Sequence, residues 1–405
     1  MPISPELSGQ SHQSDYPTVS WNEKGGQRVA RWRSENGLPP PKRVVIADDQ
    51  MSADTAYRFA CEGTALLWRG DFQNARQLLQ ALARRAVPQK ARKSGKKSAK
   101  ASAIAAGYPA TFHQYRMAQA QRARILGMLL VPFTSGHVIP LPRAPDVSQA
   151  SQEAHGPCDA PYLSSLRELL GLIGAHEWRK QGVEIRSLEA RIHPHYGVFS
   201  PVRGEYLDLI AAEPLPAALT DTPIAMDIGT GTGVIAAILA RRGVARVIAT
   251  ENDSRAVSCA NENITRLELG RQIELVQADM YPTALYPNTR AALVVCNPPW
   301  LPGKPGTAIE RAIYDQDSRM LRAFIQGLAA HLVPNGEGWL ILSDLAEHLG
   351  LRPRESLLAM FDAAGLQVLG RRDIKPRHAS VQDTKDPLHL ARTAELTSLW
   401  RLGAT

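Results

Sequence analysis

The second half of the chain, from about residue 222 onward, alternates short apolar runs with segments of helical periodicity. The apolar runs predict strands at 224–228, 246–250, 273–277, 292–296, 338–342, 367–372 and 396–402. Helical spacing of apolar positions between them predicts helices ending near residues 242, 267, 332 and 364. Strands that alternate with helices predict an α/β protein with a parallel, doubly wound sheet.

The first half is less regular. Residues 1–42 are rich in Ser, Gly, Pro and charge, and we expect them to form a poorly ordered tail. A short strand is predicted at 42–49, and Ser52 and Asp71 are predicted N-caps of helices that run to about Trp68 and Arg85. With a further helix at 113–124, these elements predict a mainly helical accessory region at 43–147.

The Pro-rich stretch at 139–147 indicates a boundary. After it we expect a connecting segment at 148–195, with a helix at 161–180 and short strands within 183–192, and then the α/β domain at 196–405.

Charge adds a second feature, because the 405 residues carry a formal net charge of +8. The segment 88–103 has no acidic residue and predicts a flexible basic arm, with Lys90, Arg92, Lys93, Lys96, Lys97 and Lys100. Such an arm suits a polyanionic partner such as RNA, whose phosphates it would contact without reading sequence. A solvated linker between subdomains is an equally good interpretation.

Cysteine and histidine patterns argue against a metal site. The four cysteines form no C-x-x-C pair, and His193 and His195 flank a proline with no third ligand near them in the sequence. The sequence shows neither a signal peptide nor an apolar run of the ~20 residues that cross a bilayer. We expect a cytoplasmic protein without a metal and without a membrane partner.

A glycine-rich motif lies where the first strand of the α/β domain turns into its first helix. It consists of Asp227, Gly229, Thr230, Gly231, Thr232 and Gly233. Glycines at such a turn let the backbone approach a ligand closely, and a carboxylate at the end of the next strand, here Glu251, accepts ribose hydroxyls.

A dinucleotide site shares these features, but the third glycine of its G-x-G-x-x-G pattern falls at Val234. An acid two residues before the first glycine suits the methionyl ammonium of S-adenosylmethionine, which has no pyrophosphate. Asp279, after the third strand, is a candidate contact for the adenine amino group.

A second motif follows the fourth strand and consists of Asn297, Pro298, Pro299 and Trp300. The Asn297 side-chain oxygen and the Pro298 carbonyl can each accept one N–H of a planar NH2 group. This holds the nitrogen lone pair toward an incoming methyl carbon and stabilises the charge that develops. The two prolines hold the loop rigid, and Trp300 offers a face on which a base or an amide stacks.

The two motifs together resemble the class I S-adenosylmethionine methyltransferases with an [N/D]-P-P-[Y/F/W] signature, over residues 196–402. The sequence DIGTGTGVIAAILA with NPPW is similar to the release-factor glutamine N5-methyltransferases. The stretch Gly197, Val198, Phe199, Ser200 is similar to the "methyltransferase small" branch that modifies amino groups of RNA bases.

The resemblance implies a Rossmann-like seven-stranded sheet whose last strand is antiparallel. It also implies cofactor contacts and acceptor contacts. The cofactor contacts are at Gly229, Thr230, Gly231, Thr232, Gly233, Glu251, Asp279 and Met280, with Asp227 and Asn297 beside them, and the acceptor contacts are at Asn297, Pro298, Pro299 and Trp300.

Three functions stay open on this basis. The first is methylation of an exocyclic amine in RNA, ribosomal RNA in particular, which the basic arm favours. The second is methylation of a glutamine in a protein such as a release factor. The third is an RNA-binding scaffold without catalysis, against which the intact acid, glycines and NPPW motif count. Residues 1–195 match no accessory domain of either branch, and the oligomeric state is open.

Overall fold

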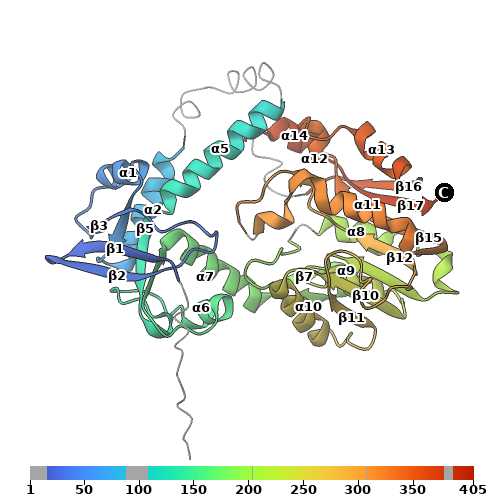
Figure 1. Ribbon diagram of the computed structural model, residues 1–405, viewed down its shortest axis with the longest axis horizontal. Coiled ribbons are helices and arrows are strands. Elements are labelled where there is room, and N and C mark those ends of the chain that lie inside the picture. The colour runs from blue at the N-terminus through green and yellow to red at the C-terminus, as the bar shows by residue number, and fades with distance from the viewer. Residues whose placement is uncertain (1–15, 88–107, 203, 308, 378–385) are drawn as a thin grey trace, which may run out of the picture. The chain divides into compact units, whose positions relative to one another are not determined.

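The computed structural model describes residues 16–87, 108–202, 204–307, 309–377 and 386–405 (Figure 1). The basic segment 88–103 and the first 15 residues lie outside the described residues, so our expectations for them stay predictions. The chain divides into two compact units. Unit 1 is Met1–Ala86 with Arg122–Leu170, and unit 2 is Val87–Gln121 with Gly171–Thr405.

Unit 2 is built on a seven-stranded sheet with the order β11-β10-β9-β12-β15-β17-β16. Its strands are β9 (Ile224–Ile228), β10 (Arg246–Glu251), β11 (Ile273–Gln277), β12 (Ala291–Cys296), β15 (Leu332–Ser343), β16 (Leu366–Ile374) and β17 (Thr397–Ala404). The strands from β11 to β15 pair in parallel, whereas β17 is antiparallel to both β15 and β16. This confirms the doubly wound sheet and its antiparallel last strand.

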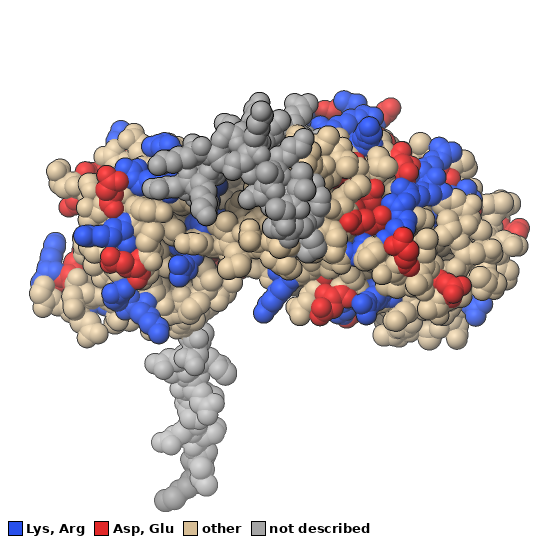
Figure 2. Space-filling model, turned by 90° about the horizontal axis from the view of Figure 1, so that it is seen from above, with Lys and Arg blue, Asp and Glu red and all other residues tan. Residues whose placement is uncertain are grey.

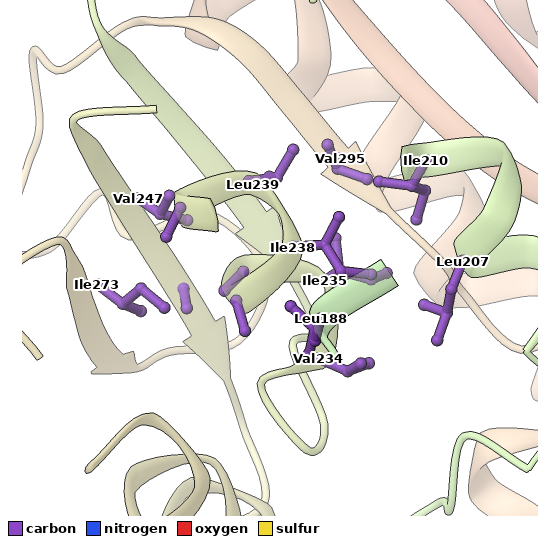
Figure 3. Packing of buried hydrophobic residues seen from close by; sticks show 14 of the residues in the cluster. Leu188, Leu207, Ile210, Val234, Ile235, Ile238, Leu239, Val247, Ile273 and Val295 are labelled. Atoms are coloured by element: carbon purple, nitrogen blue, oxygen red, sulfur yellow. The ribbon is translucent and has the colours of Figure 1, made fainter. Parts of the chain in front are cut away.

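Helices cover both faces of this sheet. They are α8 (Glu205–Ala212), α9 (Val234–Arg241), α10 (Ser254–Arg266), α11 (Arg319–His331) and α13 (Arg354–Ala363). Two shorter helices, α12 (Leu345–His348) and α14 (His389–Ala394), pack with each other and with Leu301 in a separate cluster. Figure 3 shows one face, where Ile235 and Ile238 of α9 pack with Ile210 of α8 and Val295 of β12. A second cluster, with Phe324 of α11, fills the other face. Because the central strands are buried on both sides, they are mostly apolar, and the fully buried β12 carries no polar side chain other than a thiol.

Unit 2 also takes in segments from before the start predicted at 196. The strands β7 (Val183–Ile185) and β8 (Ala190–Ile192) contribute to the same buried cluster as α9. The helix α5 (Tyr108–Leu126) contributes Phe112, which packs against Leu301. Part of the expected accessory region is therefore structurally part of unit 2.

Unit 1 contains a six-stranded sheet with the order β1-β2-β6-β5-β4-β3. Its strands are β1 (Thr18–Glu23), β2 (Gly26–Trp32), β3 (Arg43–Ala47), β4 (Thr64–Trp68), β5 (Leu129–Phe133) and β6 (Tyr162–Ser165). The edge strands β1 and β3 contact each other, so the sheet curls around a core supplied by its own strands, including Val19, Trp32 and Leu67. Its helices are α1 (Ala53–Cys61), α2 (Phe72–Arg85) and α6 (Ser148–His155), and α7 (Leu166–Gln181) begins in it.

The predicted poorly ordered tail is wrong for its described part, because residues 18–32 form the β1–β2 hairpin. Its two-residue turn has Lys24 and Gly25 at φ 51° and 77°, the positive values that a tight hairpin turn of this length needs. The strands are mostly polar on their outer face, which gave them the composition of a disordered tail. Arg69, after β4, donates to both oxygens of Glu23 at 3.0 and 2.7 Å and ties the hairpin to the sheet.

The prediction of a mainly helical accessory region is also wrong, since β3, β4 and β5 lie within it. The helix expected from Ser52 to Trp68 ends at Cys61, and its apolar end is the buried strand β4. Gly63, at φ 76°, separates the two elements. The helix expected at 161–180 similarly begins as β6.

Among the described residues, no helix is long and apolar enough to span a membrane.

Candidate active site

The glycine loop (residues 229–233) connects β9 to α9 at the carboxyl end of the sheet. Its three glycines have φ values of 73°, 58° and 81° at Gly229, Gly231 and Gly233, which other residues rarely adopt. Gly229 and Thr230 both donate their backbone N–H to the carbonyl of Thr250, at 3.0 and 2.8 Å, and this fixes the loop to β10. A Cβ on Gly229 would meet the Met320 side chain.

Asp227 is fully buried at the end of β9. Its Oδ2 accepts hydrogen bonds from the Thr230 hydroxyl at 2.5 Å and from the Ala236 N–H at 3.0 Å. Its Oδ1 is buried and has no hydrogen-bond partner among the described residues. Burial raises the pKa of Asp227 to about 7. A carboxylate oxygen in this position calls for a cationic donor, and the ammonium of S-adenosylmethionine fits that need.

Glu251, the last residue of β10, is turned toward the glycine loop. Its Oε2 accepts the Gly231 N–H at 3.0 Å, and its Oε1 accepts the N–H groups of Asn252 and Asp253 at 2.8 and 3.1 Å. A carboxylate accepts about four hydrogen bonds, so three backbone donors leave capacity for about one more. The arrangement suits one ribose hydroxyl better than the two that the sequence argument assumed.

Asp279 and Met280 lie just beyond β11, at the same edge of the sheet. Asp279 is exposed, and its two oxygens accept from Arg319 at 3.1 and 3.2 Å, at the start of α11. Met280 has a positive φ of 72°. The adenine contact predicted for Asp279 stays a prediction, and Arg319 shares that carboxylate.

The NPPW loop (residues 297–300) follows β12 and lies beside the glycine loop. Cys296 of β12 pairs with Ile228 of β9, so Asn297 and Gly229 follow a matched pair of residues at one edge of the sheet. Within the loop, the Trp300 indole N–H donates to the Asn297 side-chain oxygen at 2.9 Å. Pro298 is buried between them. The structure thus brings the two sequence motifs together.

The segment after the NPPW loop is held by residues that sequence reasoning missed. Its strands β13 (Leu301–Pro302) and β14 (Tyr314–Asp315) pair with each other. Arg116 of α5 donates to the Lys304 carbonyl at 2.8 Å, and its guanidinium lies 3.9 Å from the centre of the Tyr314 ring. Arg352, which is buried, donates to the carbonyl of Trp300 at 3.3 Å. No local signal marks these two arginines, because each lies about 50 residues or more from its partner.

Asn263 of α10 is a second kind of support for the glycine loop, and the sequence did not lead us to it. Its buried amide donates to the Thr232 carbonyl at 3.1 Å and accepts the His193 N–H at 2.8 Å. An asparagine on the buried face of an amphipathic helix was a usable signal. His195, for its part, bonds Glu262 at 2.9 Å. Among the described residues there is no cluster of three or more His, Cys, Asp or Glu arranged to hold a metal ion.

Comparison with known proteins adds the family to this geometry. The Methyltransferase small domain family matches residues 189–363. These residues are a methyltransferase small domain of the class I S-adenosylmethionine-dependent methyltransferases. The match covers the glycine loop and the NPPW loop, and it includes the stretch from β8 to α13.

Two curated relatives give the range of proteins that the chain is similar to. It is 35% identical over 150 residues to the tRNA1(Val) (adenine(37)-N6)-methyltransferase of Bacteroides fragilis (strain YCH46). This alignment covers 33% of this chain and 62% of that protein. The chain is 30% identical over 159 residues to the release factor glutamine methyltransferase of Burkholderia pseudomallei (strain K96243), which covers 36% of this chain and 53% of that protein. The chain thus spans 62% and 53% of the length of these two relatives.

Among solved structures, the ribosomal protein L11 methylase of Lactobacillus delbrueckii subsp. bulgaricus aligns with a TM-score of 0.34 and 16% identity. The alignment covers 54% of this chain and 86% of that one.

Proposed function

We propose that the protein is an S-adenosylmethionine-dependent N-methyltransferase that acts on a planar NH2 group, and that this group is an exocyclic amine of a base in RNA. The observation that carries this proposal is the position of Asn297, which follows β12 directly beside the loop that follows β9. An amide oxygen at this position supports the proposal, because it can accept an N–H from an amine that faces the cofactor.

The cofactor supplies an activated methyl group, and the residues of this chain supply orientation. Asp227 offers its unpartnered oxygen to the ammonium group, and Glu251 offers its remaining acceptor capacity to a ribose hydroxyl. Asn297 and the Pro298 carbonyl accept the two N–H bonds of the acceptor amine. A nitrogen held in this way keeps its lone pair toward the methyl carbon, and the charge that develops on it is stabilised.

The charge distribution favours RNA over a protein glutamine. Residues 88–107 hold six Lys or Arg and no acid, so subtracting their charge from +8 leaves +2 for the rest of the chain. On the face drawn in Figure 2, Lys and Arg alternate with Asp and Glu over the described residues. The positive surplus is therefore concentrated in one short segment, as suits a contact with phosphates. The relative named as a tRNA adenine-N6-methyltransferase supports this acceptor class.

Methylation of a glutamine by the same site is the alternative, since a carboxamide also presents a planar NH2 group. The relative named as a release factor glutamine methyltransferase supports it. A scaffold without catalysis has less support, because it needs neither the buried Asp227 nor an asparagine beside the glycine loop.

The test is incubation with methyl-labelled S-adenosylmethionine and separated RNA and protein fractions from cells that lack the protein. We expect label in RNA. Label in protein alone would replace the RNA proposal by the glutamine alternative, and label in neither fraction would favour the scaffold.

In a separate RNA-binding titration, a chain without residues 88–103 should bind RNA more weakly than the full chain. Its affinity should also fall less steeply with salt than that of the full chain. Equal salt dependence of the two proteins would make the segment a linker.

A further inference from the structure

The hydrogen bond between the Trp300 indole and Asn297 places the two ends of the NPPW loop in direct contact. The indole N–H is a donor only, and it meets the side-chain oxygen of Asn297 at 2.9 Å. The side-chain amide of asparagine ends in one oxygen and one NH2 group of similar shape. A 180° rotation of the amide exchanges their places, so an acceptor is replaced by a donor. A donor fixed beside it permits only one of the two orientations.

Trp300 is the anchored partner of this pair. Its ring is half-buried and packs against the hydrophobic clusters on both faces of the sheet. Its carbonyl accepts from the buried Arg352 at 3.3 Å, and the next residue, Leu301, donates its N–H to the Ile313 carbonyl at 3.1 Å. Ring and backbone are thus held independently of Asn297, whose side chain makes no other hydrogen bond among the described residues.

We infer that Trp300 is a positioning residue that fixes the orientation of the Asn297 amide. In this orientation the amide oxygen, and not its NH2, is available to the amine that receives the methyl group. The oxygen has two lone pairs, of which the indole takes one. The free one, with the Pro298 carbonyl, makes a pair of acceptors that selects an NH2 group over a carbonyl. This inference rests on the proposed function and deepens it. It also assigns the tryptophan a role besides the stacking face that the sequence predicts.

The kinetic test is a double-mutant cycle with Trp300→Phe and Asn297→Asp. Phenylalanine keeps a flat ring but loses the N–H. Aspartate has two equivalent oxygens, so its orientation needs no lock, and it belongs to the same [N/D]-P-P signature. We expect Trp300→Phe to lower kcat about tenfold in the Asn297 protein, as for loss of one ordinary hydrogen bond, and at most about twofold in the Asn297→Asp protein.

Trp21→Phe is a matched control, because it removes an indole donor that meets Glu23 in unit 1 at 2.9 Å. We expect it to leave kcat unchanged. Equal losses from Trp300→Phe in both backgrounds would overturn the inference. So would a loss that appears in the KM of the acceptor, since that is the signature of a stacking surface.

A second measurement needs no methyl acceptor and so separates this inference from the proposed function. The chain has seven tryptophans, and in a spectrum of the 15N-labelled indoles the Trp300 signal is the one missing from Trp300→Phe. In Asn297→Ala we expect this indole proton to shift upfield and to exchange faster with solvent. An unchanged shift would contradict the hydrogen bond. If Asn297→Asp transfers no methyl group, or if one variant fails to fold, the kinetic cycle cannot be completed. The indole spectra of the folded proteins then decide whether Trp300 bonds Asn297.

Discussion

The glycine loop and the NPPW loop lie side by side at the carboxyl edge of one sheet, yet they are held in different ways. Most side-chain contacts of the glycine loop come from within 20 positions in the chain: Asp227 bonds Thr230 and Ala236, and Glu251 of the adjacent strand bonds Gly231. Asn263, which bonds the Thr232 carbonyl from 31 positions away, is an exception. The NPPW loop and the segment after it depend on residues far along the chain, Arg116 and Arg352. The cofactor side is therefore mostly locally encoded, whereas the acceptor side depends on segments from across the unit.

This difference predicts that the two sides can be damaged separately. Asn297→Ala should have the largest effect, a fall in kcat of at least ~100-fold, because it removes an acceptor that acts in the transition state. The affinity for S-adenosylmethionine, measured by calorimetry, should fall no more than about threefold. Unchanged transfer in this variant would refute the NPPW mechanism.

The matching change on the cofactor side is Asp227→Asn, which keeps the shape and removes the charge. We expect affinity for S-adenosylmethionine to fall about 10- to 100-fold, as for loss of a hydrogen bond between charged groups. Normal binding in calorimetry would return the glycine loop to the dinucleotide interpretation.

The pH dependence of cofactor binding sharpens the same comparison. Because burial raises the pKa of Asp227 to about 7, the wild-type affinity should rise as pH increases from 6 toward 7.5 and the carboxyl ionises. Without cofactor, the stability of the folded protein depends on pH in the opposite direction. The raised pKa contributes stability that is full below about pH 4 and is lost as pH rises through about 7. Asp227→Asn should abolish both dependences, and a slope that persists in that variant would assign them to another group.

The smallest effect is expected from Arg116→Ala, which releases the segment after the NPPW loop. Loss of its contacts with the Lys304 carbonyl and the Tyr314 ring should lower kcat/KM for the acceptor about three- to tenfold. Cofactor binding should not change. Arg85→Ala, which removes an exposed ion pair with Asp54 in unit 1, is the control. Equal effects of the two variants would mean that α5 does not shape the acceptor side.

The same contrast explains how far the sequence could predict the molecule. In unit 2 the strands are short apolar runs separated from the helices by polar residues, proline or glycine, and the ends predicted for β9 and β11 are the observed ones. In unit 1 the hairpin strands are half polar, and β4 continues the apolar pattern of the helix before it. The turn residues Gly25 and Gly63 mark where these strands begin, and the periodicity of apolar positions alone does not reveal them.

For the site, the sequence predicts residues at the ends of strands, such as Asp227 and Asn297, and the structure brings them to one edge of the sheet. Their roles stay predictions. The sequence did not reveal Arg116 or Arg352, because the carbonyls that they bind lie 188 and 52 residues away in the chain. Asn263 was missed although its place on the buried face of α10 marks it. A carbonyl has no identity in the sequence, so a side chain that binds one leaves no paired signal. This is why the cofactor side was the more predictable.

The most direct test of the account is the chemical identity of the product. Labelled product from the transfer assay is digested to nucleosides or amino acids and identified by chromatography with mass spectrometry. We expect the methyl group on a nitrogen that was a planar NH2 group, an exocyclic amine in RNA. A methyl group on a ring nitrogen, a carbon or a ribose oxygen would contradict it.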